Sequence, residues 1–263
     1  RKTVLNGQEV PANLADETAK RLAEIARRHA ITAEYLRVQA LKGVIKDGAG
    51  DTLTNLFTDF GESQKEVDFV LGTDGTNVRE KDEEVRAHIE DNLLGDSFDG
   101  VEALVSPEFL NKLIKHPEVE KFYTSSPDVS QIRMLERYRN AGITGRVFNP
   151  FGGVTYLEYR GSAPVSSGTE KFIAANEGHA YPTGTTNLFS TFGAPADSLD
   201  EVNQLPAVTE IDPGDEAGRF ALPVYISSEP LKFGKGVEMW SDINILPFCK
   251  QSRAALVKIH TSN

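Results

Sequence analysis

The longest regular segment that the sequence predicts is a helix from Asn13 to Lys42, and it constrains the fold more than any other feature. Asp16, three positions after Asn13, completes a capping-box-like start, and Gly43 stands where a left-handed C-terminal cap belongs. About 28 residues at ~1.5 Å each give a rod of roughly 40 Å around which the rest of the chain must pack. Apolar residues recur along it at the three- and four-residue spacing of one helix face: Leu22, Ile25, Ala26, Ala33, Leu36 and Ala40.

The composition argues against several classes of protein. With 39 acidic against 28 basic residues and a net charge of −11, the chain lacks the positive balance of a general nucleic-acid-binding module. No apolar run approaches the roughly 18 residues that cross a bilayer. The single cysteine, Cys249, cannot form an intrachain disulfide, and its place beside Phe248 in an apolar run predicts a buried, unreactive thiol.

The remaining pattern mixes helices and strands, which predicts an α+β chain of one or two lobes. The clearest unit is a strand followed by the cap Ser106, by Pro107 at the first helical position, and by an apolar helix stripe. An acidic, proline-bearing tract over residues 198–218 predicts a surface excursion. The other expected elements are a hairpin of residues 44–46 and 52–58, helices over 77–94 and 128–139, and strands over 101–105, 147–148, 154–159, 172–175, 222–226 and 254–259.

No motif in the chain has the spacing of a catalytic, cofactor or metal site. The acidic turn Asp47–Asp51 lacks the ligand ladder of a calcium loop, and Gly95–Gly100 only loosely resembles a nucleophile elbow. A phosphate-binding loop is absent from the sequence as well. We therefore predict no catalytic residue, no cofactor and no metal site. The five histidines are dispersed, without the spacing of a zinc pair: His29, His88, His116, His179 and His260.

Several segments, taken in order, resemble a known family. The order is the long helix, the hairpin, the strand-cap-helix unit of Gly100–Glu118, and then four further segments: Phe172–Gly178, Tyr181–Gly184, Asn187–Gly193 and Asp242–Ile259. In this order they resemble tailed-bacteriophage major capsid proteins of the lambda type, the phage capsid protein E family. The resemblance covers nearly the whole chain, and it rests on patterns of apolar residues rather than on invariant chemical motifs.

This resemblance implies the Hong Kong 97 capsid fold, with a peripheral domain built on the long spine helix and an axial domain. Residues 1–95 and 187–250 would form the peripheral domain, residues 96–186 the axial domain, and residues 251–263 a closing strand that returns to the axial domain. The implied function is structural: self-assembly into pentamers and hexamers of an icosahedral head shell.

The resemblance also implies where this protein acts and with what. The shell would enclose DNA without binding it specifically and would form part of the virion, after a period in the bacterial host cytoplasm. Scaffold, portal and decoration proteins would be its further partners, and no membrane would be involved.

The resemblance further implies a contact between subunits in the loop of residues 229–236, between strands over 224–227 and 237–245. Glu229, Lys232 and Lys235 would pair with residues of neighbouring copies. An exposed ion pair contributes about 0–1 kcal/mol, so assembly would depend on many weak contacts repeated over the shell.

One departure from the family and two alternative functions remain open. The family places an N-terminal arm and an extended loop before the spine helix, both apparently absent here, so we expect this polypeptide to be a monomer or small oligomer. An encapsulin-like compartment shell is one alternative and would need a cargo-docking surface. The other is an α+β enzyme with a non-local active site, which would show shifted titratable groups in a deep pocket.

Overall fold

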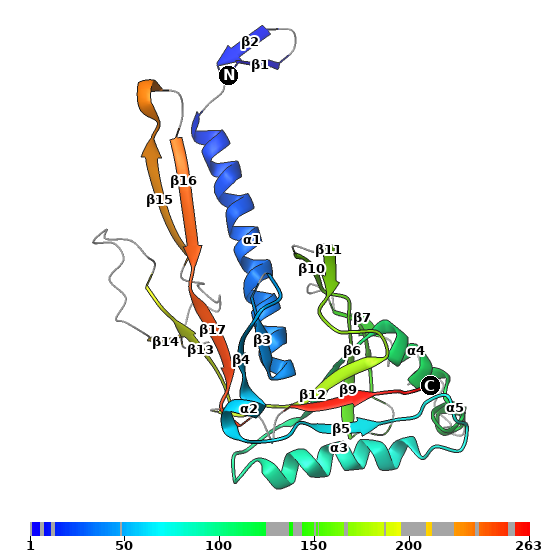
Figure 1. The fold of residues 1–263 in the computed structure, drawn as a ribbon. Coiled ribbons are helices and arrows are strands. Elements are labelled where there is room, and N and C mark those ends of the chain that lie inside the picture. Colours follow the sequence, from blue (N-terminus) through cyan, green and yellow to red (C-terminus); the bar gives the residue numbers. More distant parts are fainter. Residues whose placement is uncertain are drawn as a thin grey trace. The chain divides into compact units, whose positions relative to one another are not determined.

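Figure 1 shows the chain as a computed structural model that forms two compact units. Unit 1 comprises Arg1–Glu34 and Thr191–Leu246, and unit 2 comprises Tyr35–Ser190 and Pro247–Asn263. The expected division into peripheral and axial domains, with boundaries at residues 95, 186 and 250, stays a prediction. The structure describes the chain except residues 1, 6–7, 12–13, 48, 125–136, 139–143, 150, 152, 166–167, 187, 196–208, 212–223, 235–236 and 252–255.

The predicted long helix is confirmed as α1 (Leu14–Lys42), while its expected cap at Asn13 lies outside the described residues. Its end follows the sequence prediction closely. Gly43 has a φ of +76° and donates its N–H to the carbonyl of Ala40 over 3.1 Å. A Cβ at this position would collide with the ring of Phe57, so only glycine fits both the backbone and the space.

Unit 2 is built on a seven-stranded mixed sheet. β18 lies between two partners far apart in sequence, running parallel to β5 and antiparallel to β12. The final strand predicted over residues 254–259 is thereby confirmed at residues 257–259, while residues 254–255 lie outside the described residues and Leu256 is not part of the strand. In spatial order the strands are β5 (Lys65–Asp68), β18 (Val257–His260), β12 (Glu177–Thr183), β6 (Gly100–Val105), β9 (Val154–Tyr159), β8 (Thr144–Phe148) and β7 (Arg137–Tyr138).

Three helices cover one face of this sheet: α3 (Val78–Asn92), α4 (Pro107–Lys115) and α5 (Pro117–Thr124). The predicted strand-cap-helix unit is confirmed, because the hydroxyl of Ser106 accepts the N–H of Phe109 over 3.2 Å. Side chains of β6 at alternate positions point into this core, as the period of a strand requires. The centre of the core is aromatic and contains Phe69, Phe109 and Tyr156.

A second, smaller core in unit 2 contains Cys249, whose side chain is fully buried. The predicted burial of this cysteine is confirmed. Burial raises the pKa of its thiol to about 12, which disfavours the reactive thiolate. The surrounding elements of unit 2 are β3 (Val44–Lys46), β4 (Thr52–Asn55), α2 (Leu56–Phe60), β10 (Ser162–Val165) and β11 (Gly168–Lys171).

Unit 1 contains the first part of α1 and a long antiparallel hairpin of β15 (Val224–Pro230) and β16 (Val237–Ile243), closed by the short helix η1 (Lys232–Gly234). α1, β13 and β17 each pass from one unit into the other. The remaining strands are β1 (Lys2–Leu5) paired with β2 (Gln8–Pro11), and the three-stranded order β14 (Thr209–Ile211), β13 (Phe189–Gly193) and β17 (Ile245–Cys249).

Two sequence predictions about strands are wrong. The strand expected over residues 52–58 ends at Asn55, because the Asn55 side chain accepts the N–H groups of Phe57 and Thr58 and caps α2. Residues 172–175 form bends and a turn rather than a strand. Phe172 is buried there by packing on Tyr35 of α1, with ring centroids 5.4 Å apart, and not by pairing in a sheet.

Three other expected elements coincide only in part with described residues. Arg137–Tyr138, the described end of the helix expected over 128–139, is strand β7 instead, because it pairs with β8. Of the strand expected over 222–226, residues 224–226 belong to β15. Within the acidic tract of residues 198–218, the structure describes strand β14.

None of the helices in the described part of the chain combines the length and the apolarity that crossing a membrane requires.

One buried carboxyl group makes the stability of unit 2 depend on pH. Asp82 on α3 is 1% exposed; its Oδ1 accepts the hydroxyl proton of Tyr156, and its Oδ2 has no hydrogen-bond partner among the described residues. Burial raises the pKa of Asp82 to about 7; Glu118 and Glu83 add to the rise, and the Tyr156 hydrogen bond opposes it.

We predict that the free energy of unfolding falls as the pH rises from about 4 to about 7. The folded protein keeps the Asp82 proton in this range and the unfolded chain does not, so the total loss is on the order of 4 kcal/mol. Urea denaturation at several pH values should show this slope in the wild type and a flatter one in Asp82→Asn. Asp91→Asn, an exposed change on the same helix, should keep the wild-type slope. Equal slopes in all three proteins would contradict the prediction.

Candidate self-association surface

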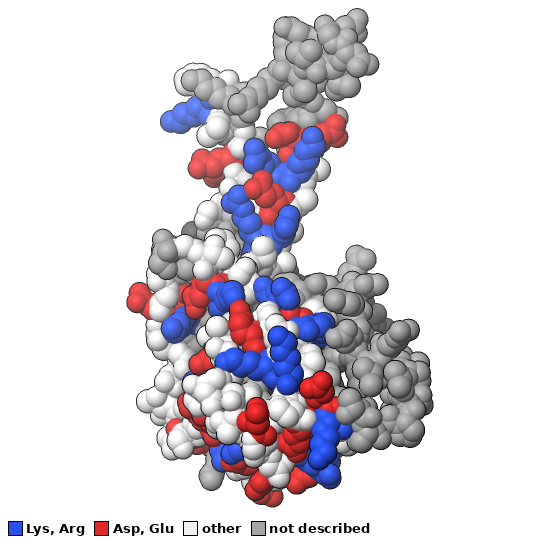
Figure 2. Space-filling model, turned by 90° about the vertical axis from the view of Figure 1, so that its right-hand side faces the viewer, with Lys and Arg blue, Asp and Glu red and all other residues white. Residues whose placement is uncertain are grey.

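Charged side chains over much of the described surface are paired with opposite charges. On α1, Arg21 and Arg28 both contact Glu24, at 3.1 and 2.6 Å. On α3, Arg86 contacts Glu90 at 2.7 Å. Figure 2 shows basic and acidic side chains beside one another on the face that it displays. Within the described residues, no group of three His, Cys, Asp or Glu side chains could hold a metal ion.

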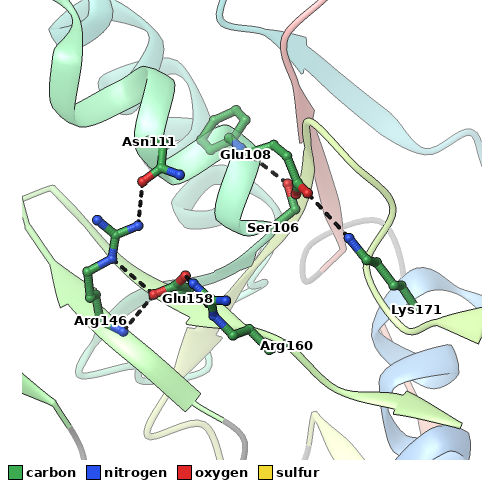
Figure 3. Close-up of polar contacts among 8 residues, drawn as sticks. Ser106, Glu108, Asn111, Arg146, Glu158, Arg160 and Lys171 are labelled. Atoms are coloured by element: carbon green, nitrogen blue, oxygen red, sulfur yellow. Dashed lines mark hydrogen bonds and ion pairs between the residues drawn. The ribbon is translucent and has the colours of Figure 1, made fainter.

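The most buried of these ion pairs lies at the edge of the unit 2 core (Figure 3). The carboxylate of Glu158 on β9 is 2% exposed and receives Arg146 Nε at 3.0 Å and Arg160 Nη2 at 2.5 Å. Arg146 also donates to Asn111 on α4 over 2.5 Å. A similar contact joins Lys171 at the end of β11 to Glu108 on α4, at 3.3 Å. These contacts tie β8, β9 and β11 to α4.

The surroundings of Glu158 keep its carboxyl group ionised. Burial alone would raise the pKa of Glu158, but the hydrogen bonds from Arg146 and Arg160 outweigh it and hold the pKa below its usual value. Gly145 leaves room for this arrangement, because a Cβ there would lie 2.6 Å from the Glu158 Oε2 atom. The cluster therefore acts as a structural clamp.

We predict that Arg146→Met lowers the free energy of unfolding by about 3 kcal/mol, because it leaves a buried carboxylate with less compensation. Arg86→Met breaks an exposed pair of the same type, with side chains 49% and 41% exposed, and should cost less than about 1 kcal/mol. Chemical denaturation measures both. Similar decreases in the free energy of unfolding of the two variants would show that the pair of Arg146 and Glu158 contributes no more to stability than an exposed ion pair.

The hairpin of unit 1 differs from these paired surfaces. Its seven cross-strand pairs run from Val224 opposite Ile243 to Pro230 opposite Val237. Because successive side chains of a strand point to opposite faces, this register divides the hairpin into two faces. One face carries Ser241, whose hydroxyl lies 3.0 Å from the ring Nε2 of His29 on α1, so this is the face next to the helix (Figure 1).

The other side of the hairpin, which we call the outer face, carries Tyr225, Ser227 and Glu229 from β15 and Glu238, Trp240 and Asp242 from β16. Trp240 is the only tryptophan of the chain and is 47% exposed. A large aromatic side chain exposed beside charged groups is typical of a surface that meets a partner.

The tip of the hairpin is also apolar and exposed. Phe233 is 92% exposed and has a φ of +63°, a left-handed conformation that is uncommon for a residue with a side chain. Leu231 and Val237 beside it are 43% and 44% exposed. A strained backbone that presents an aromatic ring to solvent indicates a functional role for the ring.

The predicted contact residues fall partly on this surface. Glu229 lies on the outer face and Lys232 at the tip, both exposed, whereas Lys235 lies outside the described residues. Their pairing across subunits stays a prediction. The sequence reasoning missed Phe233, Trp240 and Glu238. An aromatic residue inside a glycine-containing turn was the signal for Phe233, and the alternation of Glu238 and Trp240 was the signal for the outer face.

Comparison with solved structures shows the class of fold. The chain is similar to the putative capsid protein of a prophage of E. coli CFT073, with a TM-score of 0.53 and 16% identity over 99% of this chain and 74% of that one. The mixed α+β fold described above is therefore that of a phage capsid protein.

The sequence then shows the family. The chain belongs to the phage major capsid protein E family, whose profile matches residues 5–260. The major capsid protein of Pseudomonas phage KPP10 is 35% identical over 227 residues, which cover 81% of this chain and 61% of that protein. The major capsid protein of Salmonella phage Felix O1 is 25% identical over 252 residues, covering 88% and 64%. The chain thus spans less than two thirds of either relative.

Proposed function

We propose that this protein is a major coat subunit of a tailed phage or prophage and that copies of it assemble into the closed shell of the head. The observation that supports this proposal most strongly is the family match, which extends from residue 5 to residue 260 and so includes both compact units. The tip of the hairpin also supports it, because Leu231, Phe233 and Val237 together expose apolar surface of the kind that meets a partner.

The proposal extends to partners and location. Pentamers and hexamers of the subunit would form an icosahedral shell within the virion, after synthesis in the cytoplasm of the bacterial host. The net charge of −11 suits a wall that encloses DNA without adhering to it. Scaffold, portal and decoration proteins would act with the shell during assembly.

The two alternative functions have less support. An encapsulin-like shell would share the need for self-association, but both curated relatives are phage major capsid proteins. An enzyme would be expected to use titratable groups held near a reactive state. Among the described groups, Asp82 has a pKa raised to about 7, but its side chain is 1% exposed and holds the hydroxyl of the core residue Tyr156. Glu158 is held as a carboxylate by two arginines, and Cys249 is buried as a thiol.

Expressed from its complete gene, the protein should form closed particles visible by negative-stain electron microscopy and sedimenting far faster than a monomer. We predict that Phe233→Ser lowers the yield of particles at least tenfold while far-UV circular dichroism stays unchanged. The substitution removes the ring from the proposed contact between copies and leaves the hydrophobic core of the subunit intact.

The matched control is Leu94→Ser. Leu94 is also a non-glycine residue with a left-handed backbone, a φ of +52° and an exposure of 84%, but it lies in unit 2. This variant should assemble as the wild type does. Failure of the wild type to form particles would refute the proposed function, and wild-type assembly by Phe233→Ser would refute the role of the tip.

A further inference from the structure

Two histidines of unit 2 are almost fully buried, His116 at 1% exposure and His179 at 4%, and their rings are bonded differently. The ring of His116 uses both nitrogens: Nε2 lies 3.1 Å from the carbonyl oxygen of Thr73, and Nδ1 accepts the N–H of Glu118 over 3.3 Å. Neither ring nitrogen of His179 has a hydrogen-bond partner among the described residues. Buried polar groups are normally hydrogen-bonded, so His179 requires a partner that these residues do not supply.

His179 lies on the face of the seven-stranded sheet that is turned away from α3, α4 and α5. Its neighbour Ala180 belongs to the core under those helices, and successive side chains of a strand point to opposite faces. By register, Lys258 of β18 lies beside His179 on one side and Leu104 of β6 on the other. Figure 1 shows the end of α1 on this side of the sheet, across from α3. Lys42, the last residue of α1, is near enough for its charge to act on His179.

The Lys258 charge beside His179 is already balanced. Its amine lies 3.6 Å from a carboxylate oxygen of Glu66 on β5 and 3.5 Å from one of Glu177 on β12. Lys258 therefore belongs to an ion-pair network across three strands and leaves His179 to a different partner.

The Lys42 amine is the polar group near His179 that lacks a bonded partner. It has no carboxylate within 4 Å and no hydrogen bond among the described residues. Burial lowers the pKa of Lys42, and the more distant charges of Glu170 and Glu177 oppose this drop. Lys42 and His179 thus share a partly buried space, and each has hydrogen-bonding capacity that the described residues do not use.

The chemistry of the imidazole selects the ligand for this space. Burial, and then the charges of Lys42 and Lys258, lower the pKa of His179 to about 3, so the ring is neutral at neutral pH. A neutral imidazole donates through one nitrogen and accepts through the other. An anion would supply only acceptors, and the described residues contain no group of three side chains that could hold a metal ion. Water both donates and accepts, and buried waters typically bridge polar groups of this kind.

We propose that a buried water molecule bridges Lys42 and His179. Its oxygen accepts an N–H of the Lys42 ammonium, and one of its hydrogens is donated to the unprotonated ring nitrogen of His179. The N–H of the opposite ring nitrogen donates to a second water of the same site. The bridge links the last residue of α1 to β12 in the middle of the sheet, a connection that no side chain makes directly. It is a property of unit 2 and does not depend on the proposed coat role.

A high-resolution crystal structure of the protein tests the bridge directly. It should show an ordered oxygen within about 3.2 Å of both the Lys42 amine and a ring nitrogen of His179. The ring of His116 in the same crystals should keep only its two protein partners. The bridging oxygen should be lost in Lys42→Met and should remain in Lys46→Met, which removes a lysine of β3 in the same unit. Soaking the crystals in bromide separates water from an anion, because bound bromide gives an anomalous peak and water does not.

Urea denaturation of a double variant tests whether the bridge couples the two side chains. Lys42 and His179 form no direct hydrogen bond, so without the bridge their substitutions should act independently at neutral pH. We predict that His179→Leu changes the unfolding equilibrium constant by a factor that differs at least fivefold between the wild-type and Lys42→Met backgrounds. The factor measured in the Lys46→Met background should equal that in the wild type.

Four results would overturn the bridge. They are the absence of an ordered oxygen at the site, a protein atom bonded to the ring of His179, an anomalous bromide peak between the two side chains, and independent effects of the two substitutions. Where a variant does not fold, the wild-type crystal structure decides. None of these results bears on whether the protein forms particles, so the inference and the proposed function stand or fall separately.

Discussion

The packing of three aromatic rings at the centre of unit 2 holds most of its elements in place. Phe69 follows β5, Phe109 belongs to α4 and Tyr156 to β9, and their centroids lie 5.5 to 6.5 Å apart. Rings at these separations and tilts attract one another beyond simple burial. Tyr156 also donates its hydroxyl to Asp82, which brings α3 into the same arrangement. The sheet and its helices therefore share one centre, and the Glu158 clamp reinforces its edge.

The hairpin of unit 1 differs from this core in where it places its apolar and charged side chains. Its large apolar side chains, Phe233 and Trp240, are exposed, and its like charges oppose each other. Exposed apolar side chains of this kind are typical of a surface that meets a partner. The chain belongs to the phage major capsid protein E family, and in the coat role proposed above many copies would meet. The large buried core thus lies in unit 2, and the exposed hairpin of unit 1 is the surface that suits the proposed association.

The sequence was a good guide wherever the deciding information is local. The helical period and Gly43 placed α1, and the Ser106–Pro107 cap placed α4. It was a poor guide where long-range partners decide. Phe172 was expected in a strand and is buried by Tyr35 instead. The opposition of Glu229 and Glu238 depends on the hairpin register, which single residues do not reveal, so one acid of the pair was predicted and its partner was missed.

The position of β18 also determines when the protein can fold during its synthesis. β5 and β12 both emerge from the ribosome before Val257–His260, the strand that must lie between them. At roughly 5–20 residues per second, several seconds pass in which two strand edges have no partner. Open edges of this kind pair readily with other chains. Translation of many such chains close together therefore carries a risk of mispairing until β18 is inserted between β5 and β12.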